Sequence, residues 1–317
     1  MKSEYRTGLL KVDEKSNKLV KKVGVFCCGA DPLGFIKLLG LDDFANISGI
    51  YTDESQIEIV NALAPGLYTN NPFGLISNSD IVLVVKTDDS SFNLMVESIL
   101  NYKSVIIASP WNLQIDELEK LEKLSREASV KVFPLLDFPY WGFVVKNSSL
   151  IDLSLHSSIR FSKDSNNVLS LHEVRSLLFS LMYLAFYWAK AGSRKVYVNN
   201  VPVRNNELSL INVWLDFDNG SSAEIQLNLW SEISVLDAIV YQKGRQINFN
   251  MLENSVISKT ESCKTEQFLI EDNFGSGAFY RQILHIINRK SEKDTISIHS
   301  GNFRNILTDF LKVAEKL

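Results

Sequence analysis

A glycine turn directly follows the first strongly apolar segment of the chain. Val23 to Cys28 (VGVFCC) is apolar, and Gly29 comes next. At such a strand-to-helix turn, backbone N–H groups and the amino end of a helix can bind a phosphate. The usual dinucleotide-binding pattern, GxGxxG, is only partly present, because Cys27 takes the place of the first glycine and Pro32 that of the third. The turn therefore either binds a nucleotide in a modified way or keeps only the shape of the turn.

Further candidates for cofactor binding follow the later strands of the same segment. Asp53 stands at the end of the second expected strand, where a carboxylate can accept hydrogen bonds from an adenosine ribose. The neighbouring Thr52 leaves the choice between NAD and NADP open, and the altered turn leaves open that no cofactor binds. The expected cofactor contacts are Gly29, Ala30, Pro32, Leu33, Thr52, Asp53, Thr87, Asp88, Ser109 and Pro110.

Three residues are candidates for the acid or base of a reaction, because each side chain can carry a proton at a reacting oxygen. Lys86 ends a buried strand, and Tyr140 lies in DFPYWG, where one domain passes to the next. His156 lies in LSLHSSIRF, with Arg160 on the same side of the expected strand. Each has a structural alternative: a solvated lysine, a packed aromatic side chain, and a surface or packed histidine.

Strands and helices alternate from residue 22 to about 137. Short apolar runs predict strands at 23–28, 47–51, 80–86, 104–108 and 130–136, and the intervening patterns predict helices at 34–41, 55–64, 90–101 and 112–128. Asn112 is the expected cap of the last helix. The run DIVLVVK is apolar on both faces, as in parallel sheets covered on both sides. This alternation is typical of an α/β fold with a doubly wound, Rossmann-type parallel sheet.

The pattern changes after Asp137. A long apolar helix is predicted from about Val168 to Ala191, and Asn219-Gly220 predicts a hairpin between 208–217 and 222–229. Other expected strands are 153–161, 195–201, 235–241 and 246–250, and other expected helices are 278–289 and 302–317. The sequence therefore predicts an N-terminal extension (1–21), a Rossmann-type domain (22–137) and an α+β substrate and oligomerisation domain (138–317) with an open, mostly antiparallel sheet.

Several segments, in this order and spacing, resemble the Gfo/Idh/MocA family of glucose–fructose oxidoreductase, inositol dehydrogenase and their relatives. They are KVGVFCCG, GIYTDES, DIVLVVKTDDSS, SVIIASPWNLQIDELEKLEKLSREASVKVF and WLDFDNGSSAEIQLNLW. The resemblance runs from about residue 22 to the carboxyl end. It implies a Rossmann domain joined to an antiparallel α/β domain, with NAD or NADP between them. It also implies hydride transfer on a small polar, sugar-like substrate, and a homodimer.

The catalytic groups that the resemblance implies are replaced in this sequence. The family's Glu-Lys-Pro reads Ala108-Ser109-Pro110, and its Asp-x-x-x-His pair falls near Leu178 and Met182. These side chains do not move protons as lysine and histidine do. Two hypotheses remain: a divergent NAD(P)-dependent oxidoreductase with another acid or base, or a catalytically inactive family member that binds a ligand or a protein.

Composition limits the partners. A length of 317 residues favours two domains, and 33 basic against 37 acidic residues argue against nucleic acid as the main partner. Three cysteines without metal-ligand spacing indicate a reducing compartment and no metal site. The start of the chain lacks the apolar core of a signal peptide, and Leu177–Ala189 is too short to cross a membrane. We therefore expect a cytoplasmic protein with a small-molecule substrate and no membrane partner.

Overall fold

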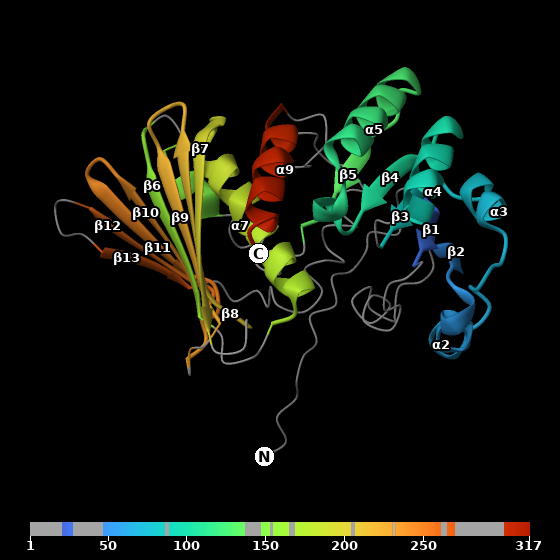
Figure 1. Cartoon of the computed structure of the whole chain (residues 1–317), viewed down its shortest axis with the longest axis horizontal. Coiled ribbons are helices and arrows are strands. Elements are labelled where there is room, and N and C mark those ends of the chain that lie inside the picture. The colour runs from blue at the N-terminus through green and yellow to red at the C-terminus, as the bar shows by residue number, and fades with distance from the viewer. Residues whose placement is uncertain are drawn as a thin grey trace, which may run out of the picture.

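Two β-sheets lie at opposite ends of the molecule, with helices between them (Figure 1). The computed structural model describes residues 21–27, 47–85, 89–136, 147–152, 155–164, 169–203, 207–229, 231, 233–260, 265–269 and 301–317. The predicted helices at 34–41 and 278–289, and residues 1–20 of the predicted extension, lie outside these ranges.

The first sheet has five parallel strands in the order β2-β1-β3-β4-β5. The strands are β1 (Val23–Phe26), β2 (Ile47–Tyr51), β3 (Ile81–Val84), β4 (Ser104–Ile107) and β5 (Val132–Pro134). Every residue of β1, β3 and β5 is buried, as expected of a parallel sheet with helices on both faces. The Rossmann-type sheet predicted from the alternating pattern is confirmed.

The helices of this half are α2 (Ile57–Leu63), α3 (Pro72–Ser77), α4 (Asp89–Leu100) and α5 (Ile115–Glu127), with short 3₁₀ turns η2 (Glu54–Gln56) and η3 (Pro110–Asn112). The prediction that Asn112 caps α5 is wrong. Asn112 belongs to η3, and Gln114 precedes α5 instead, with its backbone N–H donating to the Glu117 carboxylate at 2.9 Å. Pro110 starts the extra turn, because its fixed φ suits the first position of a helix.

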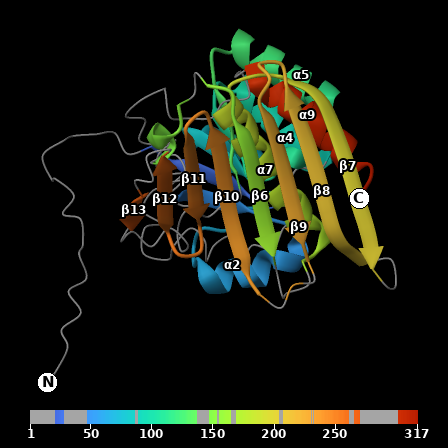
Figure 2. The same ribbon diagram turned by 90° about the vertical axis from the view of Figure 1, so that its left-hand side faces the viewer.

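The second sheet has eight strands in the order β13-β12-β11-β10-β6-β9-β8-β7 (Figure 2). They are β6 (Ser158–Asp164), β7 (Ser193–Val203), β8 (Glu207–Phe217), β9 (Ser222–Asn228), β10 (Val235–Gln242), β11 (Arg245–Asn250), β12 (Ser255–Thr260) and β13 (Thr265–Leu269). All neighbours are antiparallel except β6 and β9. The mostly antiparallel sheet is confirmed, whereas β12 and β13 were not predicted.

Two helices, α7 (Leu171–Ala189) and α9 (Gly301–Ala314), lie between the sheets, and a short turn η4 (Ser148–Leu150) precedes β6 (Figure 1). Trp188 of α7 stacks on Phe161 of β6 and on Phe249 of β11, with ring centroids 5.5 and 5.0 Å apart. Phe179 of α7 meets Phe310 of α9 edge-on at 5.3 Å. The apolar stretch predicted to be a buried helix is therefore the core of the second half. Among the described helices, none has the length and apolarity needed to span a bilayer.

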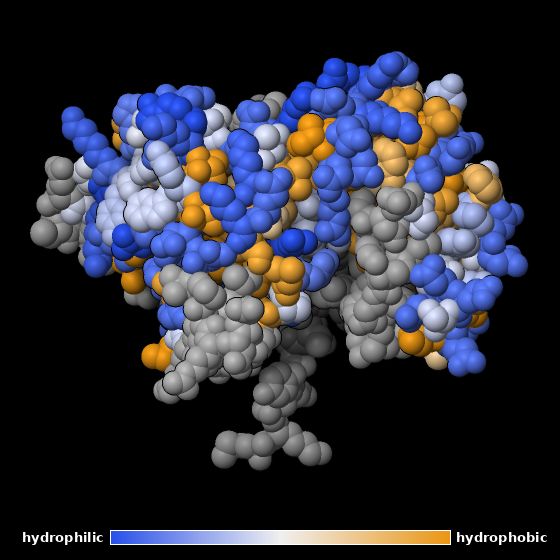
Figure 3. All heavy atoms as spheres, viewed as in Figure 1, coloured by the Kyte–Doolittle hydropathy of each residue, from blue (hydrophilic) through white to orange (hydrophobic). Residues whose placement is uncertain are grey.

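One hydrophobic cluster joins the two halves. It includes Trp111 and Leu113 next to α5, Phe179 of α7, and Phe303 and Phe310 of α9. The face of the molecule seen in Figure 3 is mostly hydrophilic, with hydrophobic side chains in small groups between polar ones. The apolar side chains that hold the halves together are thus packed inside, and this packing fixes the carboxyl end of β4 against α7 and α9.

Candidate functional site

The carboxyl ends of the parallel strands meet at one edge of the first sheet. Beyond the strands, the backbone N–H of Cys27 donates to the carbonyl of Tyr51, and that of Val85 donates to the carbonyl of Phe26, both at 2.9 Å. Strand β1 lies between β2 and β3. The order of the strands reverses at this point, because β2 follows on one side of β1 and β3, β4 and β5 follow on the other. Open α/β sheets bind ligands at such a switch point. The edge of the sheet near Cys27 is therefore the first candidate site.

Thr52 and Asp53 lie at this edge, directly after β2. Thr52 is only 4% exposed, and its hydroxyl Oγ1 has no hydrogen-bond partner among the described residues. Asp53 is exposed and extended (φ −67°, ψ 155°) at the start of η2. A sheltered hydroxyl without a partner destabilises a fold unless something bonds to it. The pair therefore fits the ribose end of a dinucleotide, which would supply bonds to both side chains.

The residues in the Glu-Lys-Pro position have structural roles. Ser109 is 6% exposed, and its hydroxyl donates to the backbone carbonyl oxygen of Val85 at 3.0 Å. Pro110, which is buried, begins η3. Ser109 can position a ligand at this part of the edge, but neither Ser109 nor Pro110 carries an ammonium group.

The residues that the resemblance places near the Asp-x-x-x-His pair, Leu178 and Met182, are part of the core. Leu178 and Met182 lie one turn apart on α7, and both are fully buried in the cluster that joins the two halves. Neither side chain can donate or accept a proton.

The prediction that His156 lies in a strand is wrong, whereas its predicted position on the same side as Arg160 fits the alternating exposure of residues 156–160. Strand β6 begins only at Ser158, and His156 lies before it, exposed, beside the β8–β9 turn at Gly220. Phe161 faces α7, so Arg160 points to the opposite face of the sheet, where its Nε lies 2.7 Å from Glu224 Oε2. A role for His156 as a proton carrier stays a prediction from sequence.

The other candidates lie outside the described residues. They are Gly29, Ala30, Pro32 and Leu33 of the turn, Lys86, Thr87 and Asp88 after β3, and Tyr140. Of the expected cofactor contacts, the structure therefore places Thr52, Asp53, Ser109 and Pro110, all at the ends of parallel strands.

Burial shifts two ionisable groups on neighbouring strands of the second sheet. It lowers the pKa of Lys163 in β6, against an opposing effect of Asp164. It also raises the pKa of Asp237 in β10, with the negative charges of Glu253 and Asp164 adding to the shift. These groups belong to the antiparallel sheet and lie outside the edge formed by β1 to β4.

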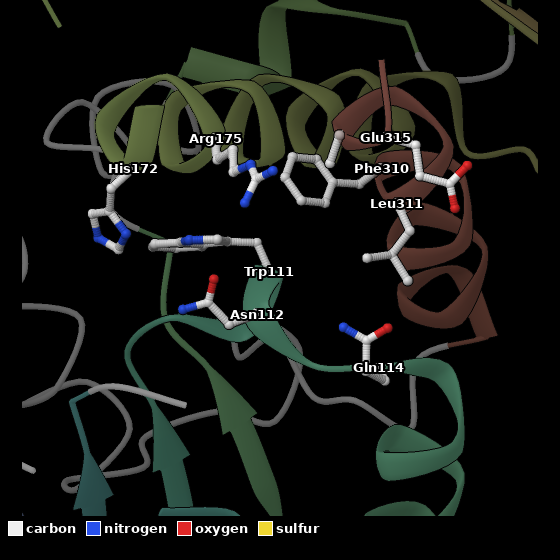
Figure 4. A pocket seen from close by; sticks show the side chains of 9 residues that line it. Trp111, Asn112, Gln114, His172, Arg175, Phe310, Leu311 and Glu315 are labelled. Carbon is white, nitrogen blue, oxygen red and sulfur yellow. The ribbon is translucent and has the colours of Figure 1, made fainter. Parts of the chain in front are cut away.

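A cavity of about 630 Å³ lies where η3, α7 and α9 meet (Figure 4). It is lined by Trp111, Asn112, Gln114, His172, Arg175, Phe310, Leu311, Ala314 and Glu315. Trp111 is 4% exposed. The centroid of its ring lies 5.7 Å from that of His172 and 6.1 Å from that of Phe179. The cavity thus begins one residue after Pro110, at the junction between the two halves of the molecule.

Two buried donors of this cavity have no partner in the described part of the chain: Nε1 of Trp111 and Nε of Arg175. Neither residue is among the site residues predicted from the sequence. One signal was available, because Arg175 is the single Lys or Arg within the apolar helix α7 and lies one turn after His172. What the sequence could not show is that η3 turns Trp111 toward this side chain.

Known structures match this fold. No protein-family profile and no curated protein sequence matches the chain. UDP-N-acetylglucosamine 3-dehydrogenase GnnA from Acidithiobacillus ferrooxidans matches with a TM-score of 0.75 at 13% identity, over 94% of this chain and 97% of that one. An oxidoreductase from Agrobacterium radiobacter, in complex with NAD⁺, L-tartaric acid and magnesium, matches with 0.75 at 11% identity, over 93% and 96%. The dehydrogenase MviM from Clostridium difficile matches with 0.72 at 13% identity, over 93% and 98%.

These matches confirm the predicted fold class, a Rossmann-type sheet joined to an open, mostly antiparallel sheet. The matched proteins are dehydrogenases and an oxidoreductase, and at 10–15% identity the match shows a shared fold.

Proposed function

We propose that the chain is a divergent member of the Gfo/Idh/MocA family, an oxidoreductase that binds NAD or NADP and acts on a small polar, sugar-like molecule. The observation that carries this proposal is the edge of the parallel sheet, where the sheltered hydroxyl of Thr52, which has no partner among the described residues, stands beside the exposed Asp53. The same fold extends over nearly the whole length of a dehydrogenase and of an oxidoreductase solved with NAD⁺. Both facts favour a dinucleotide at this edge.

Thr52 and Asp53 would hold the ribose near the end of β2, and the Gly29 turn would face the diphosphate. Ser109 and Pro110 would border the nicotinamide. A bound nicotinamide supplies or accepts a hydride. The chain itself must bind and orient the substrate and must carry the proton that accompanies the hydride.

The proton carrier has to differ from that of the family. Ser109, Leu178 and Met182 occupy the usual positions and carry no suitable group. Lys86, Tyr140 and His156 remain the candidates given by the sequence, and each can be replaced singly. An active enzyme should lose turnover in one of the variants Lys86→Met, Tyr140→Phe or His156→Gln, while NADH binding is retained.

A second function is favoured by the packing of α7. Leu178 and Met182 are completely buried, so α7 is part of the hydrophobic core at the position where the resemblance places the family's catalytic pair. A catalytically inactive family member that binds a ligand or a protein would keep the two-domain fold and need no proton carrier. This candidate predicts dinucleotide or ligand binding without turnover.

We also propose that the chain forms a homodimer through the outer face of the eight-stranded sheet. Tyr197 of β7 and Trp214 of β8 form a cross-strand pair on that face, and both are exposed. Aromatic side chains are enriched in protein interfaces. Sedimentation velocity should give a dimer, and Trp214→Glu should shift it to monomer.

Titration with NADH and NADPH tests the main proposal. Binding is followed by nicotinamide fluorescence and by the melting temperature. At one hundred times the dissociation constant, a ligand stabilises the native state by about 2.7 kcal/mol. Gly29→Val should abolish binding without lowering the melting temperature of the free protein. If neither nucleotide has an effect at millimolar concentration, the oxidoreductase proposal is refuted.

Turnover separates the two candidates. The protein with its preferred reduced nucleotide is offered a panel of keto sugars and sugar nucleotides, and loss of nicotinamide absorbance is followed. Oxidation of the nucleotide supports the enzyme, whereas tight binding without oxidation of any panel member supports the inactive binding protein.

A further inference from the structure

We propose that the cavity between η3, α7 and α9 binds a small carboxylate with an apolar body. The site is defined by the residues that line the cavity, and it shares none of them with the expected cofactor contacts. The proposal therefore goes beyond the proposed function and does not depend on dinucleotide binding.

Two buried donors in the cavity lack acceptors. Nε1 of Trp111 and Nε of Arg175 are shielded from solvent, and no described residue accepts a hydrogen bond from either. No ion pair given by the described residues includes Arg175. Buried donors in folded proteins nearly always have a partner, so two such groups in one cavity, without an acceptor among the described residues, suit an acceptor from a bound molecule.

The arrangement in Figure 4 suits an anion. The Arg175 guanidinium enters the cavity between the ring of Phe310 and that of Trp111, and the amides of Asn112 and Gln114 approach from the opposite side. Glu315 is the single acidic residue of the lining, and its carboxylate points away from the cavity. The charge that faces the interior is therefore positive, and a guanidinium offers parallel N–H groups that match the two oxygens of a carboxylate.

A carboxylate fits better than a phosphate for a second reason. Phosphates often bind at the amino end of a helix, and the amino end of α7 lies beside the cavity at His172. This end is already capped, because the Glu173 carboxylate accepts from the Ser170 backbone N–H at 2.7 Å and from its hydroxyl at 2.8 Å. The capping carboxylate would repel a doubly charged group placed there.

The remaining wall is apolar. Phe310, Leu311 and Ala314 of α9 line the cavity, and the ring of Trp111, which comes from η3, adds a further apolar surface. A volume of about 630 Å³ is within the usual range of small-molecule sites. The ligand therefore combines a carboxylate at Arg175 with a flat or branched apolar body against α9.

Nuclear magnetic resonance of the indole N–H groups tests the proposal directly, because each of the five tryptophans gives one resonance. Trp111→Phe identifies the resonance of Trp111. The full-length protein without nucleotide is titrated at constant ionic strength with benzoate, succinate or inorganic phosphate, and with sodium chloride as the control salt. We expect benzoate to move the Trp111 resonance saturably and to bind more tightly than succinate, and we expect no effect of phosphate or chloride.

Arg175→Met tests the anchor of the carboxylate. The substitution keeps the length of the side chain and removes its charge, and we expect the affinity for benzoate to fall about tenfold or more. Arg126→Met is the matched control, since Arg126 of α5 is exposed and, among the described residues, pairs with Glu122 one turn away. It should leave benzoate binding unchanged. No described residue forms an ion pair with Arg175 or accepts a hydrogen bond from its Nε, so the melting temperature should not fall. Should Arg175→Met misfold, Arg175→Lys, which loses the fork of N–H groups, is expected to bind benzoate more weakly.

Three results would overturn the proposal. They are the absence of a saturable shift at Trp111 with both carboxylates, benzoate binding to a folded Arg175 variant as tight as to the wild type, and an equal response to phosphate. Loss of NADH binding alone does not bear on it, because the titration uses the protein without nucleotide.

Discussion

The hydroxyl of Ser109 donates a hydrogen bond to the backbone carbonyl oxygen of Val85, 3.0 Å away, and so ties the end of β4 to the end of β3. Ser109→Ala removes this donor from a sheltered place, and we expect the free energy of unfolding to fall by about 1 kcal/mol. Urea denaturation measures the change. Ser77→Ala is the control, because Ser77 makes a similar bond to the carbonyl of Phe73 at an exposed position. An equal loss in both variants would contradict the structural role of Ser109.

Thr52→Val should have opposite effects on the free and the bound protein. Valine has nearly the shape of threonine, so it removes a buried hydroxyl that has no partner among the described residues. We expect the free protein to gain about 1 kcal/mol in free energy of unfolding and to bind the preferred dinucleotide about tenfold more weakly. Denaturation and fluorescence titration give the two numbers. A variant less stable than wild type would show that the hydroxyl has a structural partner.

Leu178→Ala should be severely destabilising. The side chain is fully buried on α7, and such a truncation in a packed core costs about 2–5 kcal/mol. The neighbouring Leu177 is only partly buried, so Leu177→Ala should cost much less. Denaturation of the two variants in parallel tests the difference. Comparable small losses would mean that position 178 lines an open groove and not the core.

Asp237→Asn should stabilise the protein in a pH-dependent way. Burial, helped by Glu253 and Asp164, raises the pKa of the Asp237 carboxyl. The native state then holds this proton more tightly than the unfolded chain does, so the group favours folding at low pH. That contribution is lost as the pH rises from the ordinary carboxyl range through the raised pKa.

Asparagine keeps the shape of Asp237 and stays neutral. The melting temperature of Asp237→Asn should therefore exceed that of wild type at neutral pH, and the gain should vanish below the ordinary carboxyl range. Thermal melts across this range measure the effect. A gain that is the same at every pH would show that charge is not its cause.

Strands and helices could be predicted from the sequence where burial requires nearly all of their residues to be apolar. Strand β3 is apolar on both faces, and α7 is apolar nearly all round, so both are evident in the sequence. Strand β12 is different, because Ser258 is buried there and accepts a hydrogen bond from Nε of Arg245 in β11 at 2.8 Å. A polar residue that is buried by bonding to a neighbouring strand breaks the alternation of apolar and polar residues from which a strand is predicted. Helix α3 was missed because six residues are too few to show a period.

The candidate sites also differ in how far the sequence could predict them. Thr52 and Asp53 were predicted because the end of a parallel strand is a local feature of the sequence. The cavity depends on three segments far apart in the chain, with Trp111 from η3, Arg175 from α7 and Phe310 from α9. Their meeting is a property of tertiary packing, and the sequence showed only a lone arginine in an apolar helix.

The position of β6 in the second sheet affects how the chain can fold during its synthesis. Both of its hydrogen-bonded neighbours, β9 and β10, come later in the sequence, and the strands on either side form two separate meanders that β6 alone connects. While the chain emerges from the ribosome, Ser158–Asp164 has no strand to pair with until residue 222 and those after it are synthesised. A chain interrupted between them would expose a strand with two open edges, the form most prone to pair with another molecule.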